Sequence, residues 1–200
     1  ALAYFSLIQT YARPYAQNPA AVGVPLRLKG ETSGGNNDLA FAKVSEIYDQ
    51  IIKDLDEAEK GLPDSYADAL TSISRARKVA AIALKSRVYL VKGDYTKVIE
   101  EASKIVSTSN TAGTTTVGLE NDVTTVFNGS YTGKEAIFTI PFSLPSEAPG
   151  LQSSLAGNYL SPVLYLNPTG IIADAVFQST STDKRKNLIK TNAAGQLLLN

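Results

Sequence analysis

Four residue types are missing from this 200-residue chain: cysteine, histidine, methionine and tryptophan. Without cysteine there can be no disulfide, no thiolate metal site and no thiol nucleophile. Without histidine, the usual acid–base catalyst and the commonest metal ligand are missing. No nucleophile–base set can be assembled from what remains. We therefore expect no enzyme, with no catalytic residue, no metal site and no bound cofactor.

An excess of charge of either sign is missing too. The 19 basic and 19 acidic residues give a net charge of zero. Nucleic-acid binding needs a basic surface, and so does electrostatic attachment to an anionic membrane. No apolar run approaches the roughly 20 residues of a membrane-spanning helix. The sequence thus predicts no nucleic-acid partner, no electrostatic attachment to a membrane and no membrane-spanning helix.

The clearest local pattern is a pair of short helices between residues 74 and 107, joined by a tight turn at Lys92–Tyr95. Each helix carries one apolar stripe at helical spacing, so each has a face that must be covered. Small alanines at positions 80, 81 and 83 allow two helix backbones to approach closely. Such a pair is typical of tetratricopeptide-type repeats of about 34 residues, which bind partners or build scaffolds.

The remaining pattern predicts a mostly α-helical fold with tetratricopeptide-like helix pairs (an α–α superhelix), long loops and a short β element. We expect a single domain over 1–200, with a helical scaffold in 1–108 and a loop-rich ligand side in 109–200. Both chain ends are apolar, and we expect the domain to be incomplete. The other predicted elements are helices at 1–12, 39–60 (capped by Asn37 or Asp38) and 170–178, and a strand at 135–140.

Charge is distributed unevenly between the predicted helices. Acids dominate 39–60, whereas bases dominate 74–107, so opposite charge can help these helices select each other. The acidic run Asp54–Glu59 lies along one helix. Glycosidic chemistry needs two carboxyl groups facing each other across a sugar, about 5–10 Å apart. We therefore interpret this run as a solvated helix face, and Asp183 with Arg185 as a structural pair.

Aromatic and amide side chains in the loops are the candidate ligand site. Aromatic rings cover the flat faces of sugars, and amides bond their hydroxyl groups. Each ring can equally be a core residue, and the lack of tryptophan weakens the pattern. The candidate ligand-binding residues are Tyr131, Phe142, Asn158, Tyr159, Tyr165 and Asn167.

Several segments, taken in order, resemble the SusD/RagB family. Each segment alone is a weak signal, and the resemblance is dense over 1–108 and loose afterwards. The segments are Ala3–Leu7, the loop Gly23-Val24-Pro25-Leu26, the helix Val44–Leu55 followed by Leu62-Pro63, the helix Arg77–Leu90 followed by Gly93-Asp94-Tyr95, Glu135–Phe138 and Asp183–Lys186.

The resemblance implies a lipid-anchored protein of the outer membrane at the cell surface of Bacteroidetes. It implies that an oligosaccharide nutrient is captured and handed to a TonB-dependent, SusC-like transporter. Two alternatives stay open: a RagB-like component of a peptide importer, which the low aromatic content of 8% mildly favours, and a pure protein-interaction scaffold.

Overall fold

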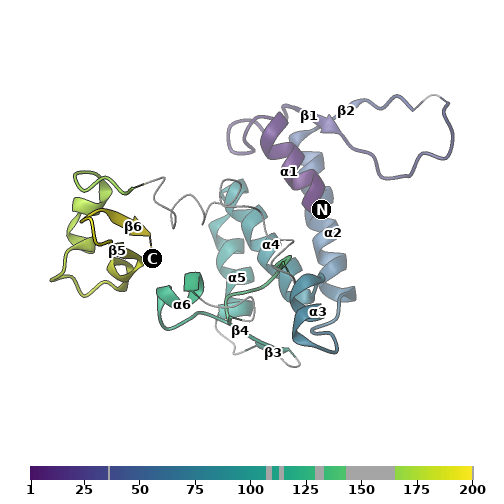
Figure 1. Cartoon of the computed structure of the whole chain (residues 1–200). Helices are drawn as coiled ribbons and strands as arrows, with labels where there is room; N and C mark the ends of the chain where they lie inside the picture. The colour runs from purple at the N-terminus through teal and green to yellow at the C-terminus, as the bar shows by residue number, and fades with distance from the viewer. Residues whose placement is uncertain (36, 107–109, 113–114, 129–132, 143–164, 200) are drawn as a thin grey trace. The chain divides into compact units, whose positions relative to one another are not determined.

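The computed structural model of the chain describes residues 1–35, 37–106, 110–112, 115–128, 133–142 and 165–199. The chain forms two units, Ala1–Gly118 and Leu119–Asn200. Long helices build the first unit, whereas short helical turns and a hairpin build the second (Figure 1). The expected mostly helical fold, with helix pairs, long loops and small β elements, is confirmed.

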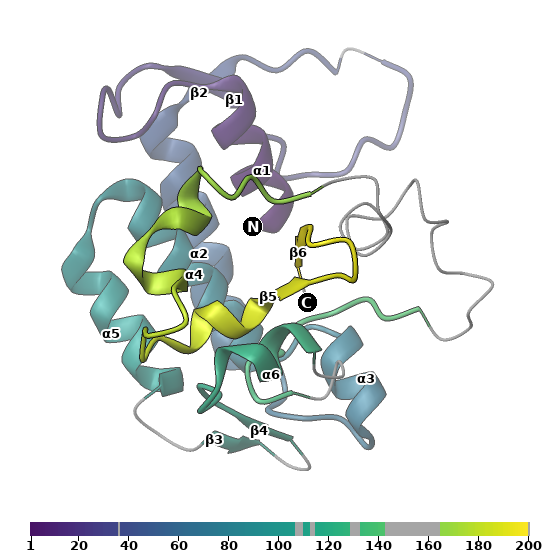
Figure 2. The same ribbon diagram turned by 60° about the vertical axis from the view of Figure 1, so that its left-hand side comes forward.

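The first unit contains five helices and two small antiparallel hairpins among its described residues. Helix α2 packs on α1 and β1 at one end and on α4 along its length, while α4 and α5 lie side by side (Figure 2). The elements are α1 (Leu2–Tyr11), β1 (Val22–Pro25), β2 (Phe41–Lys43), α2 (Val44–Gly61), α3 (Ala69–Ser74), α4 (Lys78–Lys92), α5 (Tyr95–Val106), β3 (Asn110–Ala112) and β4 (Thr115–Val117).

Helix α2 begins later than the sequence pattern predicts. Neither Asn37 nor Asp38 caps it, because the chain first pairs as strand β2 with β1. The Glu46 side chain instead accepts a hydrogen bond of 2.8 Å from the backbone N–H of Lys43. This is half of a capping box, which satisfies a backbone donor at the helix start. The predicted start at residue 39 is therefore wrong, and the helix starts at Val44.

Strand β1 packs directly onto α2 through a glycine. A Cβ atom at Gly23 would lie 2.6 Å from Cδ1 of Ile47 and 3.1 Å from Cδ1 of Ile8. Only a residue without a side chain lets the strand come this close. Ile47 and Ile8 belong to a core cluster that also holds Phe5, Tyr48 and Ile51. Burying each such side chain stabilises the fold by about 1.5–3 kcal/mol.

The predicted helix pair is present as α4 and α5. Helix α4 ends at Gly93 with φ +81°, and the N–H of Asp94 returns to the carbonyl of Tyr89 at 3.0 Å. A left-handed residue at this place ends the helix and reverses the chain. The sequence predicts that the apolar stripe of α5 is covered, but two of its residues are exposed: Tyr95 is 65% exposed and Ile99 67%.

The second unit contains α6 (Val123–Asn128), the 3-10 helices η3 (Ile171–Ala173), η4 (Ala175–Phe177) and η5 (Lys184–Leu188), and the hairpin β5 (Ile189–Thr191) and β6 (Leu197–Leu199). Two predictions are wrong here. Residues 135–140 form turns and bends because no described strand pairs with them, and the Glu135 carboxylate binds the N–H of Glu120. Residues 170–178 form two 3-10 turns, because Asp174 ends the first turn and caps the second.

Candidate functional site

A cavity of about 540 Å³ opens among the short elements of the second unit. Its volume lies within the usual range for small-ligand sites, roughly 300–1,000 Å³. The walls combine apolar side chains with amide, hydroxyl and ammonium groups, and they include no carboxylate. The lining residues are Pro168, Ile172, Phe177, Gln178, Ser179, Lys186, Asn187, Ile189, Thr191 and Leu197.

Two aspartates fix the helical turns that form the walls. Asp174 Oδ1 accepts a hydrogen bond from the N–H of Val176 at 3.0 Å and so caps η4, which carries Phe177. Asp183 Oδ1 accepts from the N–H of Arg185 at 2.9 Å and caps η5, which carries Lys186. Side-chain oxygens at such positions satisfy the backbone donors at the start of a helix.

The pairing of Asp183 with Arg185 is structural, as expected. Arg185 Nη2 lies 2.7 Å from Asp183 Oδ2, and Nε lies 3.0 Å from Oδ1. Hydrogen bonds from the Arg185 side chain and backbone lower the pKa of Asp183 to about 2. The carboxylate is therefore ionised at neutral pH, and its charge is compensated by Arg185.

Two polar side chains of the cavity hold the backbone of its own walls. Gln178 Nε2 donates toward the carbonyl oxygens of Ile172 at 3.3 Å and Ala173 at 3.2 Å. Lys186 Nζ donates to the carbonyl oxygens of Ser179 at 2.9 Å and Ser181 at 2.6 Å. These bonds join η3, the 178–181 segment and η5, so the cavity has walls held by side chains.

The residues predicted as ligand contacts lie partly outside the described residues. Tyr131, Asn158 and Tyr159 fall there. Phe142 and Tyr165 are exposed, at 61% and 43%. Neither lines the cavity.

Asn167 precedes the lining residue Pro168. Its Oδ1 accepts hydrogen bonds from Thr169, at 3.0 Å from the backbone N–H and 2.9 Å from the hydroxyl. The side chain thus builds the turn that contains the lining residue Pro168. Whether Asn167 and the other predicted residues contact ligand stays a prediction.

Sequence reasoning missed the ring and the cation that line the cavity. Phe177 lay within a predicted helix, so its ring was not counted among the loop aromatics. Lys186 lay in a charged stretch that was interpreted only through Asp183 and Arg185. The sequence does contain a signal for these two residues. Asp174 and Asp183 are each a capping residue at the start of a short helical turn, and the third or fourth residue of such a turn can line a cavity.

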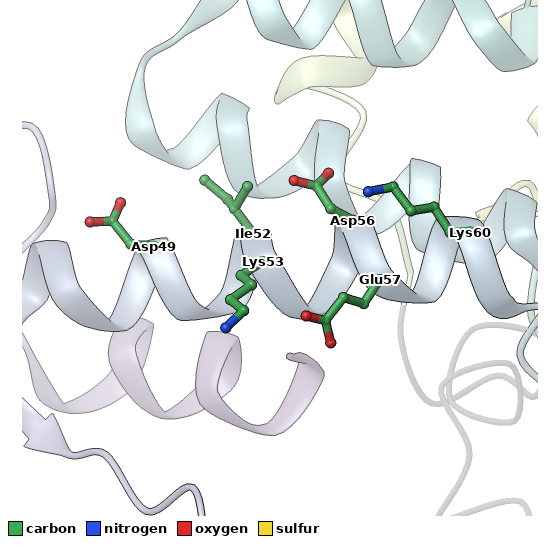
Figure 3. Close-up of a pocket in the computed structure, with 6 residues that line it drawn as sticks. All are labelled: Asp49, Ile52, Lys53, Asp56, Glu57 and Lys60. Carbon is green, nitrogen blue, oxygen red and sulfur yellow. The ribbon is translucent and has the colours of Figure 1, made fainter.

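A second hollow, of about 370 Å³, lies on α2 and is lined by Asp49, Ile52, Lys53, Asp56, Glu57 and Lys60. Figure 3 shows these side chains spaced along a single helix, with acids and lysines interleaved. The hollow holds no aromatic ring, and its charges can neutralise one another. Among the described residues, no group of three or more carboxylates could hold a metal ion.

The acidic run of α2 is more than a solvated face, contrary to the sequence interpretation. Lys85 of α4 is buried, and its Nζ lies 2.9 Å from Asp56 Oδ1 and 3.1 Å from Glu101 Oε1. It also pairs with Glu59, whose other oxygen lies 2.9 Å from Lys104 Nζ. These five charges tie α2, α4 and α5 together, and we call them the Lys85 network.

Electrostatics within the Lys85 network favour the charged forms. Burial by itself would lower the pKa of Lys85, but the hydrogen bonds that it donates to Glu59, Asp56 and Glu101 outweigh burial and raise the pKa above its usual 10.5. Burial would raise the pKa of Glu59, but the two lysines outweigh it and bring the pKa below 4.5. The charges of the network pair with one another, so the network holds the three helices together.

Comparison with known proteins gives consistent matches. Residues 1–90 match the model of a SusD-like family described as starch-binding and associating with the outer membrane. A SusD-like protein P2 of Formosa agariphila is 36% identical over 102 residues, which are 49% of this chain and 18% of that protein.

Solved structures add the fold. A SusD superfamily protein from Bacteroides fragilis matches 99% of this chain and 43% of its own, with a TM-score of 0.72 and 32% identity. A laminarin-binding SusD-like protein matches 68% of this chain and 27% of its own, with a TM-score of 0.51 and 26% identity. The chain therefore spans less than half the length of these relatives.

These matches agree with the resemblance of the sequence to the SusD/RagB family. Among the helices that the structure describes, none is long and apolar enough to cross a membrane.

Proposed function

We propose that this chain captures oligosaccharide nutrients at the cell surface and hands them to a TonB-dependent, SusC-like transporter in the outer membrane. The observation that carries the proposal is the match of residues 1–90 to a starch-binding, outer-membrane family. The laminarin-binding neighbour supports a glycan ligand. In the complete protein, a lipid anchor upstream of this chain holds it at the membrane.

Capture in this proposal is non-covalent. The chain lacks histidine and cysteine, so the residues that usually make and break bonds at neutral pH are missing. Rings and amides of the second unit hold the sugar, and release into the transporter needs only that these contacts be exchanged. The predicted contacts Tyr131, Phe142, Asn158, Tyr159, Tyr165 and Asn167 belong to this proposal.

Calorimetric titration against a panel of soluble glycans and mixed peptides tests the proposal. The panel includes starch oligosaccharides, laminarin, and neutral and acidic plant or algal oligosaccharides. We expect saturable heat with one glycan class and none with peptides. Tyr165→Ala should weaken binding, while Tyr95→Ala, which changes an exposed ring on α5, should leave it unchanged. Saturation with peptides alone would replace this proposal with a peptide importer.

Transfer to the transporter is tested separately. A SusC-like transporter from the same organism is co-expressed with the full-length protein, and any complex is purified from outer membranes. Co-purification in a fixed ratio supports hand-over. A chain that binds glycan but never co-purifies with the transporter would contradict that half of the proposal.

A further inference from the structure

Among the residues that line the cavity of the second unit, Lys186 is the one with a charged side chain. Residues 165–199 hold four bases and two acids, and Lys184 of this segment also pairs with Asp122, 3.2 Å away. Both acids are engaged in capping, and Asp183 is also paired with Arg185. The lining includes Lys186 but no carboxylate. An electropositive cavity without its own anion attracts an anionic ligand.

The bonds of Lys186 leave donor capacity for such a ligand. A lysine ammonium group carries three N–H donors. Among the described residues, Lys186 Nζ donates to two neutral carbonyl oxygens, those of Ser179 and Ser181, and pairs with no carboxylate. The backbone bonds hold the ammonium group in place without cancelling its charge. A third, charge-assisted bond to an anion is the strongest kind of hydrogen bond it can add.

The other lining groups suit a sugar ring. Phe177 supplies the half-buried aromatic face, and Ile172 and Leu197 extend the apolar surface. Ser179 and Thr191 supply hydroxyl groups, which can donate to or accept from sugar hydroxyls. A purely apolar anion would leave these polar groups unmatched, and a neutral sugar would leave the ammonium charge unmatched.

We infer that this cavity binds an acidic sugar residue, with Phe177 against the ring face and Lys186 on its carboxylate or sulfate group. The inference rests on the proposed glycan function and names the class of glycan. It also separates two roles of Lys186, which holds the wall through backbone carbonyls and binds the ligand through its charge.

Matched ligands and matched variants test the inference. The full chain is titrated with oligogalacturonate, with the same oligosaccharide after carboxyl reduction, and with a sulfated galactan oligosaccharide. Lys186→Gln removes the cavity cation, and Lys190→Gln removes an exposed cation of β5 that does not line the cavity. Phe177→Leu removes the ring but keeps an apolar side chain.

We expect one of the acidic ligands to bind and the carboxyl-reduced form to bind at least ten-fold more weakly. Lys186→Gln should weaken acidic binding about ten-fold or more, since a hydrogen bond between charged groups is lost. Lys190→Gln should change it less than about two-fold, after allowance for screening. Comparison of the titrations with oligogalacturonate and with the sulfated oligosaccharide decides whether the cavity binds a carboxylate or a sulfate group.

Folding of each variant is checked by thermal melting. If Lys186→Gln fails to fold, the wild-type chain still decides, because acidic binding must fall steeply with salt and the reduced ligand must bind weakly. Equal binding of acidic and reduced oligosaccharides would overturn the inference and leave glycan capture intact. Binding to peptides alone would overturn both.

Discussion

The two units of this chain differ in what they bury. Among the described residues, every buried apolar side chain except Leu198 lies in the first unit. That unit also buries Lys85 and Glu101 of the Lys85 network, where three helices meet. The second unit instead arranges capped turns around an open, polar-lined cavity. Tight packing thus fixes the shape of the scaffold, and sparse packing leaves polar groups available to a ligand.

The strongest way to break this comparison is to remove the central cation of the scaffold. Lys85→Met leaves Glu59 half-buried and Glu101 buried, with Lys104 as the remaining lysine of the network to neutralise them. We expect the free energy of unfolding to fall by about 3 kcal/mol, the low end for a broken buried pair. Chemical denaturation measures it.

Lys97→Met is the control for that prediction. It breaks the exposed pair of Lys97 with Glu100, 2.7 Å apart, and should lower the free energy of unfolding much less than Lys85→Met does, because solvent screens an exposed pair. Equal losses in the two variants would mean that the Lys85 network contributes no more than a surface pair.

A smaller effect is expected where β1 meets α2. Gly23→Ala places a methyl group 2.6 Å from Cδ1 of Ile47, so the core must shift. Overpacking of this kind costs about 1–3 kcal/mol. Gly30→Ala meets nothing within 4 Å and serves as the control. A Gly23→Ala protein as stable as the control would show that the strand does not pack as described.

The turn of the helix pair gives a smaller effect again. Gly93 has φ +81° and no atom within 4 Å of an added Cβ, so Gly93→Ala isolates the backbone cost. We expect a loss of about 1 kcal/mol in thermal or chemical unfolding. Gly61→Ala, at the end of α2 with equally open surroundings, should be neutral. A neutral result at both positions would argue against the left-handed turn.

The smallest expected effect is on the stability of the chain at acidic pH. The pKa of Glu59 is lower in the folded chain than its ordinary 4.5, so its stabilising contribution is present above pH 4.5 and is lost as the pH falls through the folded value. Glu59→Gln should therefore flatten the decline of stability below pH 4.5. An unchanged acid profile in the variant would assign that decline to other carboxyl groups.

The sequence predicted the scaffold better than the site because helical periodicity is a strong signal. The stripe of α2 and the Gly93 turn were both readable. The start of α2 was not, because Phe41 fits the helical stripe but pairs with Pro25 in a hairpin. Burial of Lys85 was hidden too, since a lysine at a helix surface is ordinarily exposed and only its partners from two other helices reverse this.

The cavity was harder to predict because its residues come from five short elements without periodicity and from the segments next to them. Phe177, Lys186 and Thr191 meet only after two capped turns and a hairpin have formed. The loop aromatics Phe142 and Tyr165 were identifiable by type, but residue type alone does not place side chains together. Glycan contacts for them stay predictions that the alanine variants address.

Hydrogen exchange of the chain with and without its bound oligosaccharide tests the central claim most directly, since it reports on both units at once. The claim is that the first unit is scaffold and the second unit binds the sugar. We predict slowed exchange within 165–199, strongest around Phe177 and Lys186, and unchanged exchange in α1, α2, α4 and α5. Slowed exchange confined to those helices, with 165–199 unchanged, would contradict the account.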